Sequence, residues 1–195
     1  MAAPADLLAQ AAEEPGVRAV AALSARFAYG LMCLTLCLGV MTVTGWGRHA
    51  VSRKAMRAAH LSLGTLTIVF AVVHAVCFRF LPSGPMPLEH LLTPFVPNVR
   101  HGLGVVSLYL MVAVALSACL HGWTAYRRWA WLHRTAYLAI PLGALHSLLG
   151  ALANGHLSVL WLGGITLLVP AVTLAVLRAL PAHTLERLGV ETEKV

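Results

Sequence analysis

Residues 56–80 read MRAAHLSLGTLTIVFAVVHAVCFRF, and this stretch decides the fold. It is apolar over the roughly 20 residues that a helix needs to cross a hydrocarbon core of about 30 Å. Lipid offers no hydrogen-bond partner to a peptide group, so a segment of this kind crosses the bilayer only as a helix. The stretch also carries His60 and His74, and imidazoles are costly in lipid. It therefore predicts a membrane-spanning helix whose histidines have a function.

Four further runs of similar character lie at 23–46, 102–120, 129–149 and 157–180. Of the 195 residues, 59% are apolar and only 11% are charged, which excludes an ordinary soluble domain. We expect an all-α, integral-membrane helical bundle of about five transmembrane helices, forming one domain over 21–180. Residues 1–20 lack the basic and apolar regions of a secretory signal and predict a loose or interfacial tail. Residues 181–195 predict a short, charged, cytoplasmic tail.

The net charge of +7 follows the loops, which argues against a nucleic-acid partner. The first and third connections lie on one side of a five-helix chain and carry bases without an acid: Arg48, Arg53, Lys54 and Arg57, then Arg127 and Arg128. The other side has Arg79 and Arg100 with Glu89. By the positive-inside rule the basic side is cytoplasmic. The expected location is the cell (inner) membrane, with the N-terminus outside and the C-terminus inside.

All four cysteines, at positions 33, 37, 77 and 119, fall within apolar runs, so a disulfide framework is not expected. Cys33 and Cys37 lie one helical turn apart and could be soft metal ligands. The favoured interpretation is that they are small buried apolar side chains.

Ten histidines are a large number for so apolar a chain. Six of them lie in loops or at helix ends, where an imidazole reaches water easily: His49, His90, His101, His121, His156 and His183. The other four lie inside the second and fourth runs. They are His60, His74, His133 and His146, and they need a different explanation.

Within the second run the two histidines are 14 residues apart, and within the fourth they are 13 apart. At 1.5 Å per residue these intervals are about 21 Å and about 20 Å. The two helices run in the same direction because one helix separates them, so His60 is level with His133 and His74 with His146. Two six-coordinate haems stacked along the membrane normal need this arrangement, each iron taking one neutral imidazole from each helix.

The angular positions agree less well for the fourth helix. At 100° per residue, His74 returns to within about 40° of His60, but His146 lies about 140° from His133 on a straight helix. Pro141 lies between those two histidines and has no N–H to donate, so we expect it to kink the helix and turn His146 inward.

Neighbouring residues suit a haem pocket and also have plainer explanations. Gly64, Gly143 and Gly150 could let a porphyrin approach the backbone, or could serve helix packing. Arg57 and Arg134 lie where the propionates of an inner haem would project, and could pair with them. The alternative for both arginines is snorkelling to cytoplasmic headgroups.

The segment RRWAWLHRTAY at 127–137, followed by His146, resembles the Trp-x-x-Leu-His-Arg-x-x-Tyr helix of the ferric reductase-like transmembrane domain superfamily. That group includes NADPH oxidases, ferric reductases and the bacterial membrane subunit of the methionine sulfoxide reductase system. The two histidine intervals resemble its paired haem-ligand helices. The resemblance covers about 20–180 and implies that His60 with His133 binds an inner haem b, and His74 with His146 an outer one.

Family members usually have six helices, and the eukaryotic ones also carry a flavin and NADPH domain. Here five runs are found, and the chain ends 15 residues after the last of them. We therefore expect a di-haem cytochrome b that carries electrons across the bilayer as the membrane subunit of a reductase or respiratory complex. Its electron donor would be a cytoplasmic flavoprotein, an iron-sulfur protein or the quinone pool.

Two other classes of protein remain open from the sequence. One is a quinone-reactive cytochrome b that anchors a dehydrogenase or hydrogenase, with the Pro-rich segment 81–97 helping to form a quinone pocket. The other is a haem-free metal transporter or assembly protein that uses the same histidines for a transition metal.

Overall fold

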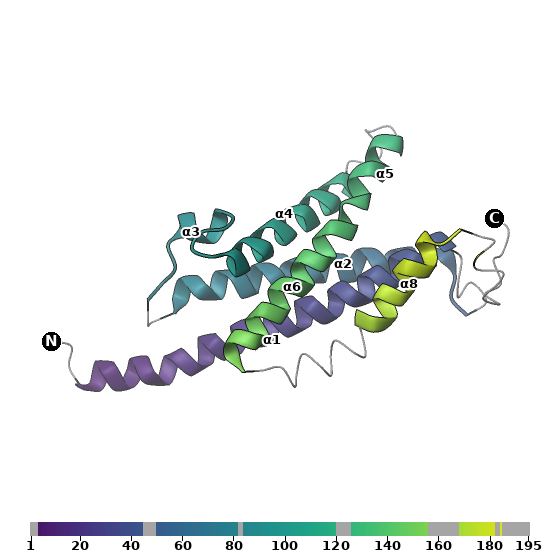
Figure 1. Ribbon diagram of the computed structural model, residues 1–195. Coiled ribbons are helices and arrows are strands. Elements are labelled where there is room, and N and C mark those ends of the chain that lie inside the picture. The colour runs from purple at the N-terminus through teal and green to yellow at the C-terminus, as the bar shows by residue number, and fades with distance from the viewer. Residues whose placement is uncertain are drawn as a thin grey trace.

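The computed structural model describes residues 4–44, 50–81, 84–119, 126–155, 168–181 and 184, with the side chains of 4–15, 126 and 178–179 left out of the description. The described chain is helical and contains no strand (Figure 1). Its elements are α1 Pro4–Thr44, α2 Arg53–Cys77, η1 Phe78–Phe80, α3 Leu88–Leu92, α4 Val99–Cys119, α5 Tyr126–Arg134, α6 Ala136–Asn154 and α8 Val169–Ala179.

Four described segments are long and apolar enough to cross a membrane: Gly16–Thr44, Arg53–Phe80, Val99–Cys119 and Arg127–Asn154. They confirm the predicted all-α membrane bundle and make the chain a multi-pass membrane protein. The fifth expected span, 157–180, lies partly outside the described residues, and α8 covers its C-terminal part. The N-terminal tail differs from expectation, because α1 is helical from Pro4 and continues into the first span without a break.

Local sequence explains where the helices begin and end. The hydroxyl oxygen of Ser52 accepts a hydrogen bond from the N–H of Ala55 at 3.2 Å, which caps the start of α2. At the other end of the bundle, α6 stops at Gly155, whose φ of 70° suits a residue without a Cβ.

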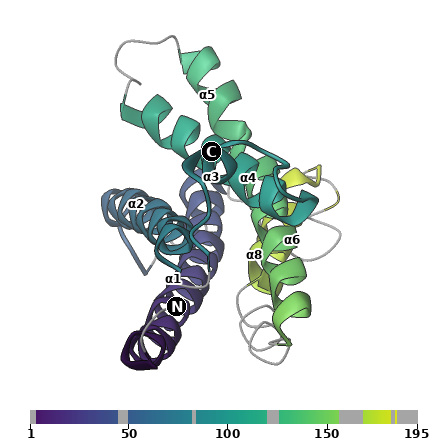
Figure 2. The same cartoon turned by 90° about the vertical axis from the view of Figure 1, so that its left-hand side faces the viewer.

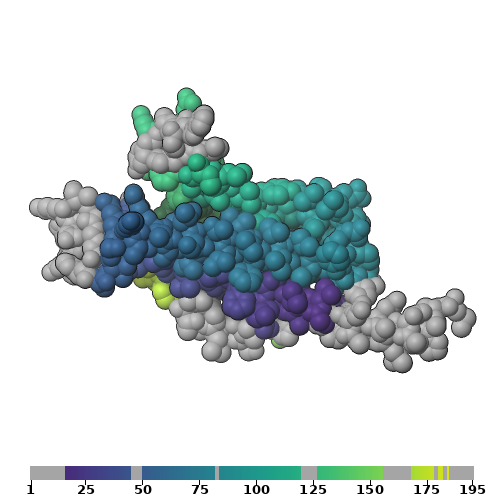
Figure 3. All heavy atoms as spheres, turned by 180° about the vertical axis from the view of Figure 1, so that it is seen from behind, coloured from purple at the N-terminus to yellow at the C-terminus, as the bar shows by residue number. Residues whose placement is uncertain are grey.

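The helices pack mainly as two antiparallel pairs. α1 lies along α2, and α4 lies along α6, while α1 also contacts α6 and α8. Viewed nearly end-on, α2 and α6 lie on opposite sides of α1 and α4 (Figure 2). On the face seen in Figure 3, α2 lies between α1 and α4. This arrangement makes α2 and α6 face each other across the bundle without packing closely together.

Most of the buried side chains in the described chain are small, and Met32 and Met56 are the larger ones among them. The largest fully buried ones in the described chain are those of Cys33 and Ser107. The Ser107 hydroxyl donates a hydrogen bond of 2.8 Å to the carbonyl of Ala139, which ties α4 to α6. Large apolar side chains such as Leu61 and Leu138 remain exposed, as expected for a surface in contact with lipid.

Candidate functional site

The four intramembrane histidines meet in two pairs between α2 and the α5–α6 segment. The ring centroids of His60 and His133 are 6.1 Å apart, and those of His74 and His146 are 6.2 Å apart. All four side chains are partly buried. One pair joins the first histidine of α2 to the first histidine of the α5–α6 segment, and the other pair joins the second histidines. The two segments therefore run in the same direction.

A break at Thr135 separates α5 from α6. The N–H of Thr135 donates to the carbonyl of Leu132 at 3.0 Å, and the N–H of Leu138 donates to the carbonyl of Thr135 at 2.9 Å. Both hydrogen bonds span three residues, and this tighter winding turns the chain by about 120° per residue instead of 100°. It therefore overwinds the helix in the direction that brings His146 toward the side of His133.

The position of this break differs from the expected one. The backbone at Pro141 remains helical, and the interruption lies six residues earlier. Proline acts on the turn before it, since it has no N–H for the carbonyl of Tyr137 and its ring crowds that carbonyl. The hydroxyl of Thr135 also bonds to the carbonyl of Leu132 at 2.7 Å, which stabilises the turn at this site.

Three of the four imidazoles are oriented by backbone carbonyls of neighbouring helices. Nδ1 lies 3.0 Å from the carbonyl of Thr35 for His60, 2.8 Å from that of Ala21 for His74, and 2.7 Å from that of Arg100 for His146. A carbonyl only accepts, so each Nδ1 carries the hydrogen and donates it. The neutral ring then has its lone pair on Nε2, the arrangement typical of a metal-ligating histidine.

His133 is the exception. Its Nδ1 is buried and has no hydrogen-bond partner among the described residues. The ring stacks instead on Trp129, one turn earlier in α5, with a centroid distance of 5.1 Å and an interplanar angle of 25°. A buried imidazole nitrogen without a partner is costly, and in this ring, unlike in the other three, no hydrogen bond to a carbonyl fixes which nitrogen carries the hydrogen.

The dimensions of both pairs fit a bis-histidine haem iron. A metal–imidazole bond of about 2.0 Å on each side, with about 1.15 Å from each nitrogen to its ring centre, places two ring centroids about 6.3 Å apart. The observed separations are 6.1 and 6.2 Å. The donor set, two neutral imidazoles in an apolar setting, is also one that haem iron uses.

The glycines nearest these rings are not those expected from the sequence. A Cβ on Gly39 would lie 3.1 Å from Cε1 of His60, and one on Gly104 would lie 2.8 Å from Cε1 and from Nδ1 of His146. By contrast, Gly143 packs against Ser107 and Met32, and a Cβ on Gly150 would meet nothing within 4 Å.

Gly64 lies one turn after His60 and faces α1, where a Cβ would meet the methyl group of Thr35 at 3.6 Å. Sequence reasoning missed Gly39 and Gly104 because both lie on helices without an expected ligand. A search for small residues on the neighbouring spans at matched depth could have found them.

The two arginines expected near one haem are exposed at the same end of the bundle. Arg57 lies one turn before His60 in α2. The guanidinium carbon of Arg134 lies 5.3 Å from the ring centroid of Trp131, so this side chain stacks on an exposed indole.

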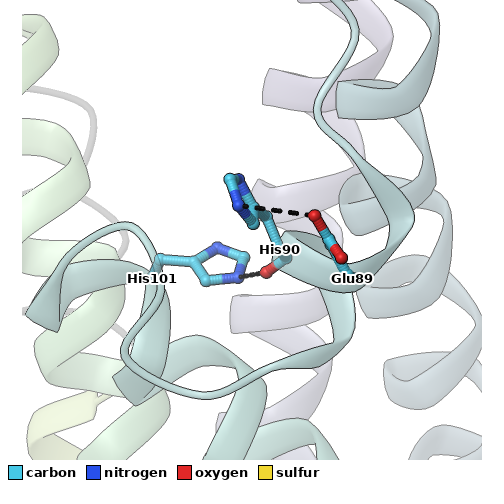
Figure 4. Close-up of polar contacts among 3 residues, drawn as sticks. All are labelled: Glu89, His90 and His101. Carbon is cyan, nitrogen blue, oxygen red and sulfur yellow. Dashed lines mark hydrogen bonds and ion pairs between the residues drawn. The ribbon is translucent and has the colours of Figure 1, made fainter.

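Two of the remaining histidines lie at the opposite end of the bundle, where α3 approaches the start of α4 (Figure 4). His101 Nε2 lies 2.7 Å from the carbonyl of His90, and His90 is 3.9 Å from the carboxylate of Glu89. Among the described histidines, neither of these two forms a ring pair like the four above. His49, His121, His156 and His183 fall outside the described residues.

No disulfide joins the four cysteines, which agrees with the expected absence of a framework. Cys33 is fully buried and Cys37 is partly buried, as small apolar side chains of α1 would be. The described residues contain no group of three or more His, Cys, Asp or Glu side chains close enough to hold a metal ion together.

Comparison with known proteins finds relatives over part of the chain. The chain is similar to the protein-methionine-sulfoxide reductase heme-binding subunits MsrQ of Brucella ovis, Brucella canis and Brucella suis. Each is 32% identical over 91 residues, which are 45% of this chain and 40% of the relative, so the match spans less than half of the relatives' length. No solved structure matches the chain significantly.

The sequence profile described as "Ferric reductase like transmembrane component" matches residues 24–144, which include three of the four paired histidines. This match covers more than half of the chain and contains α2, α4 and α5 completely. The chain therefore belongs to the ferric reductase-like transmembrane component family.

Proposed function

We propose that the protein is a membrane cytochrome that binds two haems b, one between His60 and His133 and one between His74 and His146. The observation that carries this proposal is the pair of ring separations, 6.1 and 6.2 Å, at two depths of one bundle. The names of the relatives, which describe heme-binding subunits, support the same cofactor. When bound, each haem supplies a one-electron iron couple.

The chain's own residues have three tasks in this proposal. Each imidazole supplies the lone pair of a ring nitrogen. In three of the rings this nitrogen is Nε2, because the carbonyls of Thr35, Ala21 and Arg100 accept from their Nδ1–H groups. The apolar helices exclude water around both pairs, which is how a protein sets the potential of a redox group. Exposed Arg57 and Arg134 offer charge-assisted hydrogen bonds to propionates at the His60–His133 end.

Because the two pairs lie at different depths, we propose that the protein conducts electrons across the inner membrane as a subunit of a membrane complex. In the proposed orientation the basic end with Arg57 and Arg127 faces the cytoplasm and the N-terminus lies outside. The donor would be a cytoplasmic flavoprotein, an iron-sulfur protein or quinol. The names of the relatives favour, as the acceptor, a partner that reduces methionine sulfoxide in proteins.

The grouping of the histidines favours this proposal over a haem-free metal transporter. Structural zinc sites take four protein ligands and catalytic ones take three. In the described part of the chain the intramembrane histidines come in twos, and no third His, Cys, Asp or Glu joins them. Two imidazoles per iron are what a six-coordinate haem requires, since the porphyrin supplies the other four nitrogens.

Electron conduction is tested in sealed proteoliposomes that contain the haem-loaded protein and trapped ferricyanide. A reductant added outside should bleach the trapped ferricyanide faster than in vesicles that contain the His74→Ala/His60→Ala variant, which lacks one ligand of each pair. Equal rates in both preparations would refute conduction by the proposed haem pairs.

The choice of acceptor is tested in cells. Deletion of the gene should lower the reduction of methionine sulfoxide in exported proteins, and the wild-type chain should restore it while the His74→Ala/His60→Ala variant should not. Quinol-driven and flavoprotein-driven haem reduction, measured in parallel on the purified protein, separate the two kinds of donor. Unchanged methionine sulfoxide reduction after deletion would rule out this acceptor and leave the cytochrome proposal in place.

A further inference from the structure

Two histidines of different pairs contact their neighbouring helices in the same way. His60 donates to the carbonyl of Thr35 in α1, and its ring lies against Gly39, four residues later. His146 donates to the carbonyl of Arg100 in α4, and its ring lies against Gly104, again four residues later. We call Thr35 with Gly39, and Arg100 with Gly104, the two carbonyl–glycine pairs.

The interval of four residues has a geometric reason. In an α-helix the carbonyl of residue i points along the axis toward residue i+4, whose N–H it accepts. An imidazole from another helix that reaches the same carbonyl therefore lies over residue i+4. At both positions the ring edge formed by Cε1 and Nδ1 is the part nearest to the glycine.

His74 shows the same interval with a slightly larger residue. It donates to the carbonyl of Ala21 in α1, and the residue four positions later is Ala25. The hydroxyl of Ser24 also lies 3.1 Å from the Ala21 carbonyl, but it is closer to the carbonyl of Val20, at 2.7 Å, to which it donates. A small residue thus follows each of the three carbonyls that orient a histidine.

The space at the two glycines differs by a measurable amount. A Cβ on Gly104 would lie 2.8 Å from two atoms of the His146 ring, closer than packed carbon atoms approach each other. The ring could give way only by leaving the Arg100 carbonyl, because the same ring is held at its other nitrogen in the proposed haem site. A Cβ on Gly39 would lie 3.1 Å from the His60 ring, so a shift of a few tenths of an ångström relieves it.

We propose that Gly39 and Gly104 are positioning residues that set the orientation and the basicity of the axial imidazoles His60 and His146, and thereby the reduction potentials of the two haems. This inference rests on the proposed cytochrome function. The Nδ1–H···O hydrogen bond makes an imidazole a stronger donor to iron, which stabilises the ferric state and lowers the potential. Loss of that bond raises the potential of the haem concerned.

The test combines a potentiometric titration with low-temperature EPR of the purified, haem-loaded protein. In Gly104→Ala, one of the two midpoint potentials should shift upward and one low-spin EPR signal should change, while the other haem stays as in the wild type. The haem that responds should be the one that His146→Ala removes. Gly39→Ala should produce a smaller shift in the haem that His60→Ala removes.

Matched controls separate positioning from packing. Gly150 lies one turn after His146, and a Cβ there would meet nothing within 4 Å. Gly64 lies one turn after His60, and a Cβ there would meet only the methyl group of Thr35, at 3.6 Å. Gly150→Ala and Gly64→Ala should therefore leave the potentials of both haems unchanged. Gly143→Ala strains the helix packing without touching a histidine. It should lower thermal stability without moving either potential.

The outcomes distinguish this inference from the function on which it rests. A wild-type protein that binds no haem defeats the proposed function. A wild-type protein with two b haems, together with Gly104→Ala potentials and EPR signals equal to those of the wild type, defeats the inference alone. If Gly104→Ala does not accumulate in membranes, the milder Gly39→Ala decides. An upward shift confined to one haem supports the proposal, and no shift overturns it.

Discussion

Replacing His74 with alanine removes one imidazole from one pair and leaves its partner in place. The lost ring has its centroid 6.2 Å from that of His146, and its Nδ1 lies 2.8 Å from the Ala21 carbonyl. His146 keeps its own hydrogen bond to the Arg100 carbonyl at 2.7 Å, so the opposite ligand remains oriented. The affected haem should therefore be lost or become five-coordinate and high-spin, while the haem at the other pair stays low-spin.

The size of the effect follows from the number of ligands. Four axial imidazoles in two pairs hold about two haems per chain, so each single variant should keep about one low-spin haem. His146→Ala should give the same spectrum as His74→Ala, and the double variant should be no worse than either single variant. His74→Ala combined with His133→Ala should retain no low-spin haem, because this combination damages both pairs.

The assay is the dithionite-reduced spectrum with a pyridine haemochrome count on each purified variant, and low-spin EPR separates the two haems. His101→Ala is the control, since its Nε2 contacts only the His90 carbonyl among the described groups at hydrogen-bond distance. His121→Ala, at the other end of the third span, should also leave both haems intact. A requirement for His101 or His121, with His60 dispensable, would refute the pairing between α2 and the α5–α6 segment.

Two further predictions concern topology and packing. In intact cells, a cysteine that replaces exposed Val51 should be protected from an impermeant thiol reagent, and one that replaces exposed Glu89 should react with it more than the native cysteines do. The reverse pattern would show that the proposed orientation is inverted. Gly143→Ala would place a Cβ 2.9 Å from the Ser107 hydroxyl, which its 2.8 Å hydrogen bond to Ala139 holds in place. Gly143→Ala should lower the free energy of unfolding by about 1–3 kcal/mol in a detergent-unfolding assay, and adding Ser107→Ala should restore part of it. Full stability of Gly143→Ala would contradict the packing described here.

Much of the fold could be predicted from apolar run length alone, because the bilayer permits only helices of a fixed minimum length. The matched depth of the four histidines could also be predicted from the sequence. Rise per residue and alternating chain direction place His60 level with His133 and His74 level with His146 without knowledge of packing. The start of the first helix could not be predicted from the sequence. The Ala-rich residues from Pro4 onward carry acidic side chains that suggest a tail, and yet they form the first part of α1.

The contacts around the histidines could not be predicted, because they depend on how four helices rotate against one another. No local pattern indicates that the carbonyl of Thr35 or Arg100 accepts a hydrogen bond from another helix. The same holds for the break at Thr135, where Pro141 predicts a distortion and only the three-residue hydrogen bonds show its position. Gly39 and Gly104 acquire a meaning only when the rings that cover them are known.

The haem content of the purified wild-type protein tests the central claim most directly. Two bis-histidine sites predict a low-spin b-type spectrum after reduction and a pyridine haemochrome ratio of about two haems per chain. A ratio near one would remove one of the two proposed sites. A folded preparation that holds no haem even after reconstitution with an excess of it would contradict the account.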